Sequence, residues 1–343
     1  MKTLNIKKTL LVIAFLALAN SGTFARSWRI NSNANMHADF TDLNAAMSSS
    51  DVVAGDTLCL DPGCVISTEQ SVTKSVTIVG NGFFRNAAPH SLSTITGRLY
   101  LSAAGIKVEG VILQSNNVFV RAGNITIERC HCSSSISVGY SNINAQYATI
   151  RQCYITGNIG GYGQSNTNSA YCTVENCIFN TSKVCVTGLF CPVIRNNYLK
   201  TTGTGYCLQN MSNGSVINNI IMRASYSGTN VWNISTDCTC TNNLLCMPAS
   251  VTSKTDNLFF ESSDESAFFA LQGTNDQLYR LKDGSPAKGY ATDGGDCGPY
   301  GGAVPYVPSG LPLGRPYYTK ASVSSRAADG KVNVSLNIQL QDE

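Results

Sequence analysis

Four charged residues are the first candidates for chemistry in this chain, because they recur at one position of a repeated six-residue phrase. They are Glu128, Arg151, Glu175 and Arg195, each the second residue of its phrase. An arginine here could bind a uronate or, if its deprotonation were assisted, act as the base of a polysaccharide lyase. The alternative is structural: charges of alternating sign on adjacent strands form ion pairs, each worth about 0.2–1 kcal/mol when exposed.

The same residues fit a glycoside hydrolase less well than a lyase. Hydrolysis needs two carboxylates about 5–9.5 Å apart. Glu128 and Glu175 would lie two strands apart, about 9–10 Å between backbones, with Arg151 between them. Tyr154 and Tyr198, further along their phrases, could flank a bound sugar as substrate-binding residues.

The repeated phrase reads apolar, any, polar, Cys or Asn, any, apolar. Its fourth position recurs at steps of 23, 24, 20, 22 and 24 residues, at Cys130, Cys153, Cys177, Asn197, Asn219 and Asn243. A period in this range marks a solenoid. Each copy is short, alternating and rich in β-forming residues, so the repeating unit is a strand. The sequence therefore predicts an all-β solenoid, a parallel β-helix of about eleven coils stacked about 4.8 Å apart.

The shared fourth position predicts a stack of inward-facing side chains at a bend. Cys130, Cys153 and Cys177 are expected to be reduced, buried thiols, because parallel neighbours point the same way and suit disulfide geometry poorly. Cys59 and Cys64 differ, since a turn separates them and they could form a disulfide.

Residues 1–25 are an expected signal peptide. Lys2, Lys7 and Lys8 precede a short apolar core, and Thr23-Phe24-Ala25 offers a cleavage site. The apolar run is too short to span a membrane. The sequence therefore predicts a mature protein that begins near Arg26 and is secreted, periplasmic or on the cell surface of a bacterium.

The charge of the mature chain argues against nucleic acid as a partner. The full chain has 24 Lys+Arg and 21 Asp+Glu, and residues 1–25 hold three Lys and no acid, so 21 of each sign remain and the net charge is zero. No basic patch is left to attract a phosphate backbone.

Three segments follow the signal peptide. Residues 26–50 are expected to cap the N-terminal end with a short helix, in which Phe40, Leu43 and Met47 fall at helical spacing. Residues 51–304 are expected to wind the β-helix. Residues 305–343 read as a Pro-rich linker and a C-terminal β-ribbon, with the hairpin signal Asp329-Gly330 ahead of an apolar alternation that ends at Leu340.

Several of these motifs resemble the pectin-lyase-like right-handed parallel β-helices, above all exported bacterial members. Gly55-Asp56-Thr57-Leu58 is similar to the start of such a helix. The pairs Asn196-Asn197, Asn218-Asn219 and Asn242-Asn243 are similar to its asparagine-ladder bend. The resemblance covers most of the mature chain and implies a right-handed single-stranded parallel β-helix that acts on polysaccharides.

The catalytic residues of that family have no match here. Its pectate lyases hold calcium with clustered carboxylates, and its polygalacturonases use a group of Asp residues on adjacent coils. Between Val111 and Thr255 this chain has three acids, Glu128, Glu175 and Asp237. No metal or other cofactor is therefore expected, and calcium has no support in the sequence. Alternation also sends His131 away from Cys130 and Cys132, so these three are not expected to bind a metal.

Three functions stay open. The chain could be a polysaccharide lyase or, less readily, a glycosidase. It could be a non-catalytic glycan-binding or surface module, in which Tyr, Asn and Trp232 line a groove. It could also be a structural spacer that presents its C-terminal ribbon. The sequence favours a monomeric, carbohydrate-associated protein that binds or processes a polysaccharide, and it leaves the enzymatic status open.

Overall fold

The computed structural model describes residues 25–84, 92–114, 117–139, 143–161, 167–224, 230–248, 256–273, 275–311, 316–323 and 334–340. The predicted signal peptide, apart from Ala25, and the predicted turn at Asp329-Gly330 lie outside these residues. Within the described stretches, no helix is both long and apolar enough to cross a membrane.

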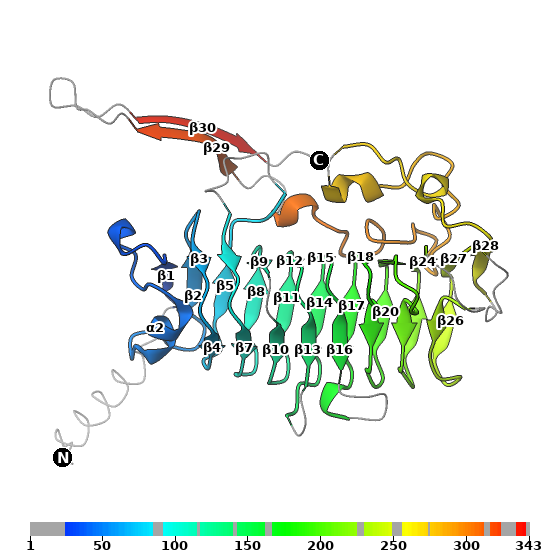
Figure 1. Ribbon diagram of the computed structural model, residues 1–343, viewed down its shortest axis with the longest axis horizontal. Helices are drawn as coiled ribbons and strands as arrows, with labels where there is room; N and C mark the ends of the chain where they lie inside the picture. The colour runs from blue at the N-terminus through cyan, green and yellow to red at the C-terminus, as the bar shows by residue number, and fades with distance from the viewer. Residues whose placement is uncertain are drawn as a thin grey trace, which may run out of the picture.

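Three long parallel sheets form the body of the molecule (Figure 1). We name them sheets A, B and C, in the order in which the chain enters them. Sheet A has ten strands: β1 (Ser27–Ile30), β2 (Thr57–Leu60), β5 (Thr77–Val79), β8 (Lys107–Glu109), β11 (Thr126–Glu128), β14 (Thr149–Arg151), β17 (Thr173–Glu175), β20 (Val193–Arg195), β23 (Ser215–Ile217) and β26 (Thr239–Thr241).

Sheets B and C complete each coil. Sheet B has ten strands: β3 (Val65–Ile66), β6 (Thr94–Ile95), β9 (Ile112–Leu113), β12 (His131–Cys132), β15 (Tyr154–Ile155), β18 (Ile178–Thr181), β21 (Tyr198–Thr201), β24 (Ile220–Arg223), β27 (Leu244–Cys246) and β28 (Leu258–Phe260). Sheet C has eight strands: β4 (Gln70–Val72), β7 (Leu99–Leu101), β10 (Val118–Val120), β13 (Ile136–Val138), β16 (Ile159–Gly161), β19 (Val186–Thr187), β22 (Leu208–Gln209) and β25 (Trp232–Asn233).

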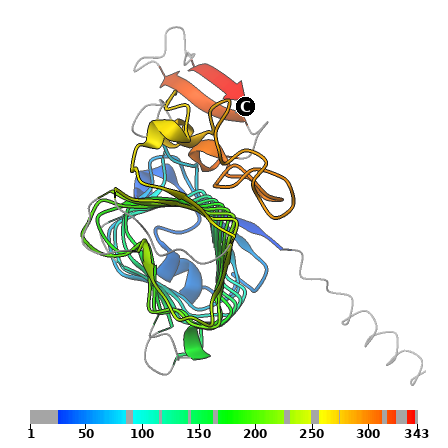
Figure 2. The same ribbon diagram turned by 90° about the vertical axis from the view of Figure 1, so that its right-hand side faces the viewer.

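Equivalent residues of successive coils pair in parallel, so each position of the repeat forms a column. Ile127 pairs with Ile150, and Ile150 pairs with Val174. Seen end on, the coils superpose around one interior (Figure 2). Alternate side chains of the strands turn inward and form one continuous apolar core. The predicted parallel β-helix, and with it the resemblance to pectin-lyase-like helices, is confirmed for the fold.

The inward stack at the fourth position of the phrase is also confirmed. Cys130, Cys153 and Cys177 are fully buried, and the column continues through Asn197 and Asn219. The Asn197 amide donates to Oδ1 of Asn219 at 3.0 Å, as one step of the expected asparagine ladder. These side-chain amides also satisfy backbone carbonyls at the bend, because buried polar groups need partners.

All fourteen cysteines lie in the described part of the chain, and all are free. The Cys130 thiol lies 3.2 Å from the carbonyl oxygen of Glu128 and donates to it. Cys59 and Cys64 are free as well, against the possible disulfide. Cys64 turns into the core, whereas Cys59 is half-buried on the outer side of sheet A.

The N-terminal end is closed by a helix, as predicted. Helix α2 (Leu43–Ser48) begins at Asp42, whose carboxylate accepts a hydrogen bond from the Ala45 amide at 2.8 Å. Its buried face seals the core beside β4. A short 3-10 helix, η1 (Ala34–Met36), precedes it. Strand β1 already pairs with β2, so winding begins at Ser27, inside the segment expected to be only a cap.

Winding ends at Phe260, well before the expected residue 304. We call residues 261–311 the strap, because they leave the coils and cross back over them. The strap contains the 3-10 helices η4 (Glu265–Ala267), η5 (Asn275–Tyr279) and η6 (Pro308–Gly310). After Cys246 the phrase is lost, and a segment without its alternation has no column to extend.

The strap runs from the last coils back toward the first along the A/B corner, the turn between sheets A and B (Figure 1). Side-chain amides at this corner hold it. Asn242 donates to the Tyr290 carbonyl at 2.7 Å, and Gln152 donates to the Pro305 carbonyl at 2.5 Å. Both residues have positive φ, and the equivalent residues of intervening coils do the same work. Near the first coils, the Phe83 amide donates to the Ser309 carbonyl.

The C-terminal ribbon is confirmed. Strands β29 (Pro316–Val323) and β30 (Val334–Leu340) pair antiparallel, with an irregularity between Tyr318 and Lys320. Ile338, on the alternating strand, is exposed.

Candidate functional site

The charged residues predicted from the repeat lie in one column on the outer side of sheet A. Glu128 pairs with Arg151, Arg151 with Glu175, and Glu175 with Arg195 across successive strands. The structure thus brings all four together.

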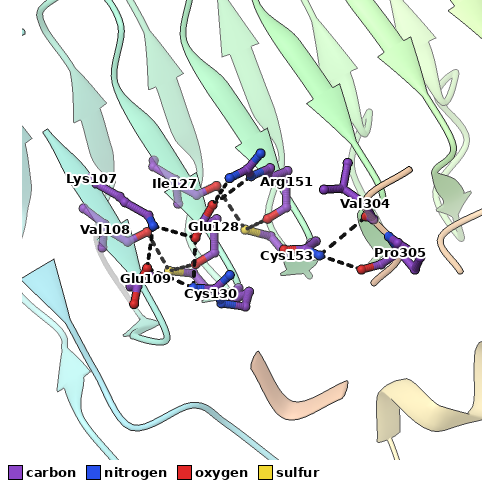
Figure 3. A network of polar contacts seen from close by, with 12 residues as sticks. Lys107, Val108, Glu109, Ile127, Glu128, Cys130, Arg151, Cys153, Val304 and Pro305 are labelled. Carbon is purple, nitrogen blue, oxygen red and sulfur yellow. Dashed lines mark hydrogen bonds and ion pairs between the residues drawn. The ribbon is translucent and has the colours of Figure 1, made fainter. Parts of the chain in front are cut away.

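Glu128 is the centre of an ion network (Figure 3). Its carboxylate lies 2.9 Å from Lys107 Nζ, 2.9 Å from Arg129 and 2.5 Å from Arg151. Burial alone would raise the pKa of Glu128, but the hydrogen bonds from Lys107 and Arg151 and the charge of Arg129 outweigh it and hold the pKa at about 2. The carboxylate is therefore ionised and fully engaged, with 1% of its side chain exposed.

Glu175 and Arg195 form a second, simpler pair. Arg195 Nη2 lies 2.5 Å from the Glu175 carboxylate, which is buried, while the arginine is 46% exposed. The ion-pair interpretation of the column therefore describes what the structure contains. The catalytic roles of Glu128, Arg151, Glu175 and Arg195 stay predictions, and every one of these side chains already has a charged partner inside the chain.

Tyr154 and Tyr198 do not lie where a sugar could reach them, and this corrects the expectation that they flank a substrate. Both turn outward from sheet B, but the strap covers them. Tyr198 is fully buried and Tyr154 is 8% exposed. Together with apolar strap residues such as Phe268 and Phe269, they form a second apolar cluster on the outside of the solenoid.

A polar contact anchors the strap at this place. The Tyr198 hydroxyl donates to Glu265 at 2.6 Å, and Lys200 Nζ lies 2.9 Å from the same carboxylate oxygen. Asn180 donates to the Tyr279 hydroxyl at 3.2 Å. Burial, with the negative charge of Glu265, raises the pKa of Tyr198 well above its ordinary value, so the phenol stays protonated as a donor. The contact between Lys200 and Glu265 was not predicted from the sequence, because Glu265 lies outside the repeat and periodicity does not relate the two residues.

Trp232 also departs from expectation. It was expected to line a groove, but it is buried in the main core at the end of sheet C. Strand alternation explains this, because Asn233 takes the outward position instead.

The outer face of sheet C remains open. Its central outward column is half-buried or exposed at every strand and consists of Ser71, Tyr100, Phe119, Ser137, Gly160, Thr187, Gln209 and Asn233. The labelled strands of sheet C lie along the lower side of the solenoid, whereas the strap lies above its upper side (Figure 1). This column is our candidate site.

Aromatic rings and an arginine stand at one end of the column. Tyr100 and Phe119 stack with ring centroids 5.0 Å apart and planes 23° from parallel. The guanidinium carbon of Arg121 lies 3.8 Å from the centroid of the Tyr100 ring, in a cation–π contact. Within the described residues, Arg121 has no carboxylate partner, and its buried Nε has no hydrogen-bond partner.

Small side chains follow the rings. Ser137 and Gly160 are the next two residues of the column, before Thr187, and we call these three residues the floor. The nearest heavy atom to a Cβ placed on Gly160 would be 3.8 Å away, so a small side chain would fit there without a clash. Lys183 stands at the edge, with Nζ 3.5 Å from Ser135 Oγ and no carboxylate partner in the described chain.

The sequence contained a signal for this site. Leu99-Tyr100-Leu101 and Val118-Phe119-Val120 alternate strictly, so both rings must point the same way, out of adjacent coils. The repeat phrase covers only strands of sheets A and B, so it does not include these strands of sheet C.

A metal centre and a cavity beside the strap are the alternatives to this face. Within the described residues, no group of three or more His, Cys, Asp or Glu could hold a metal ion. A cavity of about 640 Å³ lies between the strap and the A/B corner, lined by Gln152, Arg280, Tyr300 and Pro308 among others. Its size suits a small molecule, whereas an open face of eight strands suits a polymer.

Comparison with known proteins shows a likeness to solved structures. No family model matches the chain, and no curated protein matches it. A solved structure described as the crystal structure of pectate lyase Pel9A is similar, with 14% sequence identity and a TM-score of 0.44, over 82% of this chain and 97% of that chain. The assignment of the fold rests on the three parallel sheets of this chain itself.

Proposed function

We propose that the protein binds a polysaccharide along the outer face of sheet C. The observation that carries this proposal is the stack of Arg121, Tyr100 and Phe119 beside a floor of small side chains. A half-buried ring next to a floor of small side chains presents a flat apolar surface with little conformational freedom to lose. The C–H face of a sugar can pack on such a ring while hydroxyls around it bond to polar neighbours.

The dimensions suit a chain molecule. Three strand spacings separate Phe119 from Thr187, which is about 14 Å. Beyond Thr187, Gln209 and Asn233 offer amides that donate and accept hydrogen bonds. A ligand in this column would therefore meet rings first, then the floor, then amides.

The charges favour an anionic polysaccharide over a neutral one. Arg121 lies on the Tyr100 ring and Lys183 lies beside Ser135, and neither cation has a carboxylate partner in the described chain. A guanidinium without a counter-ion can form charge-assisted hydrogen bonds to a carboxylate or sulfate. Binding should therefore weaken as salt is raised, because exposed charges are screened.

The test measures affinity of the mature protein for polygalacturonate and for a neutral glucan. Phe119→Ala and Arg121→Gln should each lower the affinity for the anionic polymer about tenfold or more, which is about 1.4 kcal/mol. Gly160→Leu should do the same by filling the floor, since space for a Cβ exists there. Arg195→Gln, which removes a cation from sheet A, is the matched control and should bind normally. Wild-type protein that binds neither glycan contradicts the proposal.

The same samples decide between binding and processing. A lyase acting on polygalacturonate would produce an unsaturated, ultraviolet-absorbing product, and its appearance would make the protein an enzyme. Export also stays a proposal, resting on the predicted signal peptide. N-terminal sequencing of secreted material should give a start near Arg26, and a retained segment 1–25 in a membrane fraction would contradict it.

A further inference from the structure

The C/A corner, the turn between sheets C and A, repeats one backbone conformation from coil to coil. The residue two positions before a strand of sheet A has positive φ in seven coils: Gly55, Gly105, Asn124, Tyr147, Tyr171, Cys191 and Asn213. Backbone hydrogen bonds connect these turns, as from the Tyr147 amide to the Ala170 carbonyl and from the Tyr171 amide to the Phe190 carbonyl.

Tyrosine is an unexpected residue at this position. In the left-handed region, the Cβ of an L-residue crowds the backbone, which glycine avoids and which asparagine tolerates best among the others. Four of the seven coils use glycine or asparagine. Tyr147 and Tyr171 hold φ values of 60° and 58° in two consecutive coils. A strained conformation kept at two adjacent places calls for a reason outside local backbone preference.

The two rings are also exposed. Tyr147 is 53% and Tyr171 47% exposed, and they stack with centroids 5.2 Å apart and planes 14° from parallel. Neither hydroxyl has a hydrogen-bond partner among the described residues. The rings therefore neither fill a core nor satisfy a buried group.

The A/B corner shows what such positions do when they are occupied. There, side chains in the same left-handed conformation, such as Gln152 and Asn176, point outward and bind the strap. At the C/A corner, no described segment of the chain lies on the tyrosine pair. A ligand from outside would take the place that the strap takes at the other corner.

We propose that Tyr147 and Tyr171 form a second sugar-binding platform, which contacts the same polysaccharide as sheet C. This inference rests on the proposed function. Tyr147 follows β13, which supplies Ser137, and Tyr171 follows β16, which supplies Gly160. The pair thus belongs to the two coils that supply Ser137 and Gly160 to the floor, on the opposite side of the C strands from Lys183.

The surroundings select a glycan over a protein partner. Besides the tyrosines, the described part of this corner has no exposed large hydrophobic residue, and protein interfaces usually gather several. Asn124 precedes the pair in the column, and Gln146, whose side-chain amide donates to the Thr167 carbonyl, is half-buried beside it. Stacked rings rimmed by amides match the mixed apolar and hydrogen-bonding surface of a sugar.

The test replaces both rings by the residue that other coils use. The double variant Tyr147→Asn, Tyr171→Asn should fold, because asparagine suits positive φ, and its melting temperature should stay within a few degrees of the wild type. Its affinity for polygalacturonate should fall about tenfold. The double variant with Phe at both positions keeps the rings and should bind like the wild type. Asn213→Gly, at the same corner two coils beyond Tyr171, is the control and should change nothing.

A measurement on the unaltered protein complements the variants. Tetranitromethane should nitrate both exposed tyrosines in the free protein, and saturating polygalacturonate should protect them. Unchanged affinity in the Asn double variant, or full nitration in the presence of bound polymer, overturns the inference. If Phe119→Ala loses binding in the same experiment, the proposed function stands without the second platform. If the wild type binds no glycan, both fall.

Discussion

Sheets B and C differ on their outer faces although they share one interior. The outward column of sheet B includes Tyr154, Ile178, Tyr198, Ile220 and Leu244, all buried under the strap. The outward column of sheet C carries two rings at one end and small or polar residues elsewhere, all in contact with solvent. The outward residues of a solenoid face therefore decide whether it is covered or open, whereas the inward residues form only the core of the coils.

This difference is written in the sequence. The strands of sheet B read as runs, such as Ile178-Phe179 and Leu244-Leu245, which is typical of strands buried on both faces. The strands of sheet C alternate, as in Ile136-Ser137-Val138, which is typical of strands with one face in water.

A matched pair of phenylalanine truncations should show the largest difference in stability between the covered and the open face. Phe268→Ala removes a fully buried ring from the strap over sheet B and should lower the free energy of unfolding by about 3–5 kcal/mol. Phe119→Ala, on open sheet C, should cost less than about 1 kcal/mol. Urea unfolding of both variants measures the difference. Equal losses would mean that sheet C is covered too.

Acid should weaken the ion network of sheet A and leave the apolar contacts of sheet B intact. The pKa of Glu128 is about 2 in the fold, below its ordinary 4.5, so its ionised form stabilises the protein above pH 4.5. That contribution, about 3 kcal/mol, should disappear as the pH falls from about 4.5 to about 2. Glu128→Gln should therefore be much less stable than the wild type at pH 7 and approach it near pH 2. A gap that does not depend on pH would contradict the network.

The polar anchor of the strap gives a smaller effect. Glu265→Gln weakens the contacts of Glu265 with Tyr198 and Lys200 and should cost about 1–3 kcal/mol. Glu69→Gln, beside sheet C, removes an exposed partner of Arg98 that is 3.9 Å away, and its unfolding free energy should change by less than about 0.5 kcal/mol. Thermal unfolding compares them, and a larger loss in Glu69→Gln would reverse the ranking of the two faces.

Arg195→Ala should have an effect similar to that of Glu265→Gln. It leaves the buried Glu175 carboxylate without its cation and should cost about 1–3 kcal/mol, with glycan affinity unchanged. Unfolding and binding measured on one preparation test both statements. Abolished binding with unchanged stability would place the binding site on sheet A, as the functional interpretation of the repeat predicts.

Thiol reagents should not modify the interior cysteines until the protein unfolds. Burial raises the pKa of Cys130 well above its ordinary value, so little thiolate forms. Mass spectrometry after alkylation of native protein should find Cys130, Cys153 and Cys177 unmodified, and the half-buried Cys59 and Cys191 modified first. Disulfides among the three stacked residues would contradict the inward column.

Sequence reasoning reached the fold because the fold repeats. Six copies of one phrase fix strand direction, spacing and the inward position of Cys130 and Asn197 without any long-range information. The cap was also accessible, since Leu43 and Met47 show helical spacing beside an open end.

The strap and the site were less accessible, each for a physical reason. The strap has no period, and its contacts join Gln152 to Pro305 and Phe83 to Ser309 across most of the chain. Periodicity predicts columns within the repeat, but it does not predict what lies on them. The expectation that Tyr154 and Tyr198 flank a sugar requires them to face outward, and they do, yet only the position of the strap shows that outward there means buried.

The strap changes how this molecule should lose its structure. A solenoid in which each coil touches only its neighbours can open from an end, one coil after another. Here one segment binds Asn242 on a late coil and Phe83 near the first ones, so an end coil cannot peel away without also releasing contacts far along the axis. Because the strap joins the two ends of the solenoid, unfolding should be a single transition with little fraying. The strap is the last part of the body to be synthesised. The coils of a nascent chain would therefore lack its contacts until residue 311 had emerged.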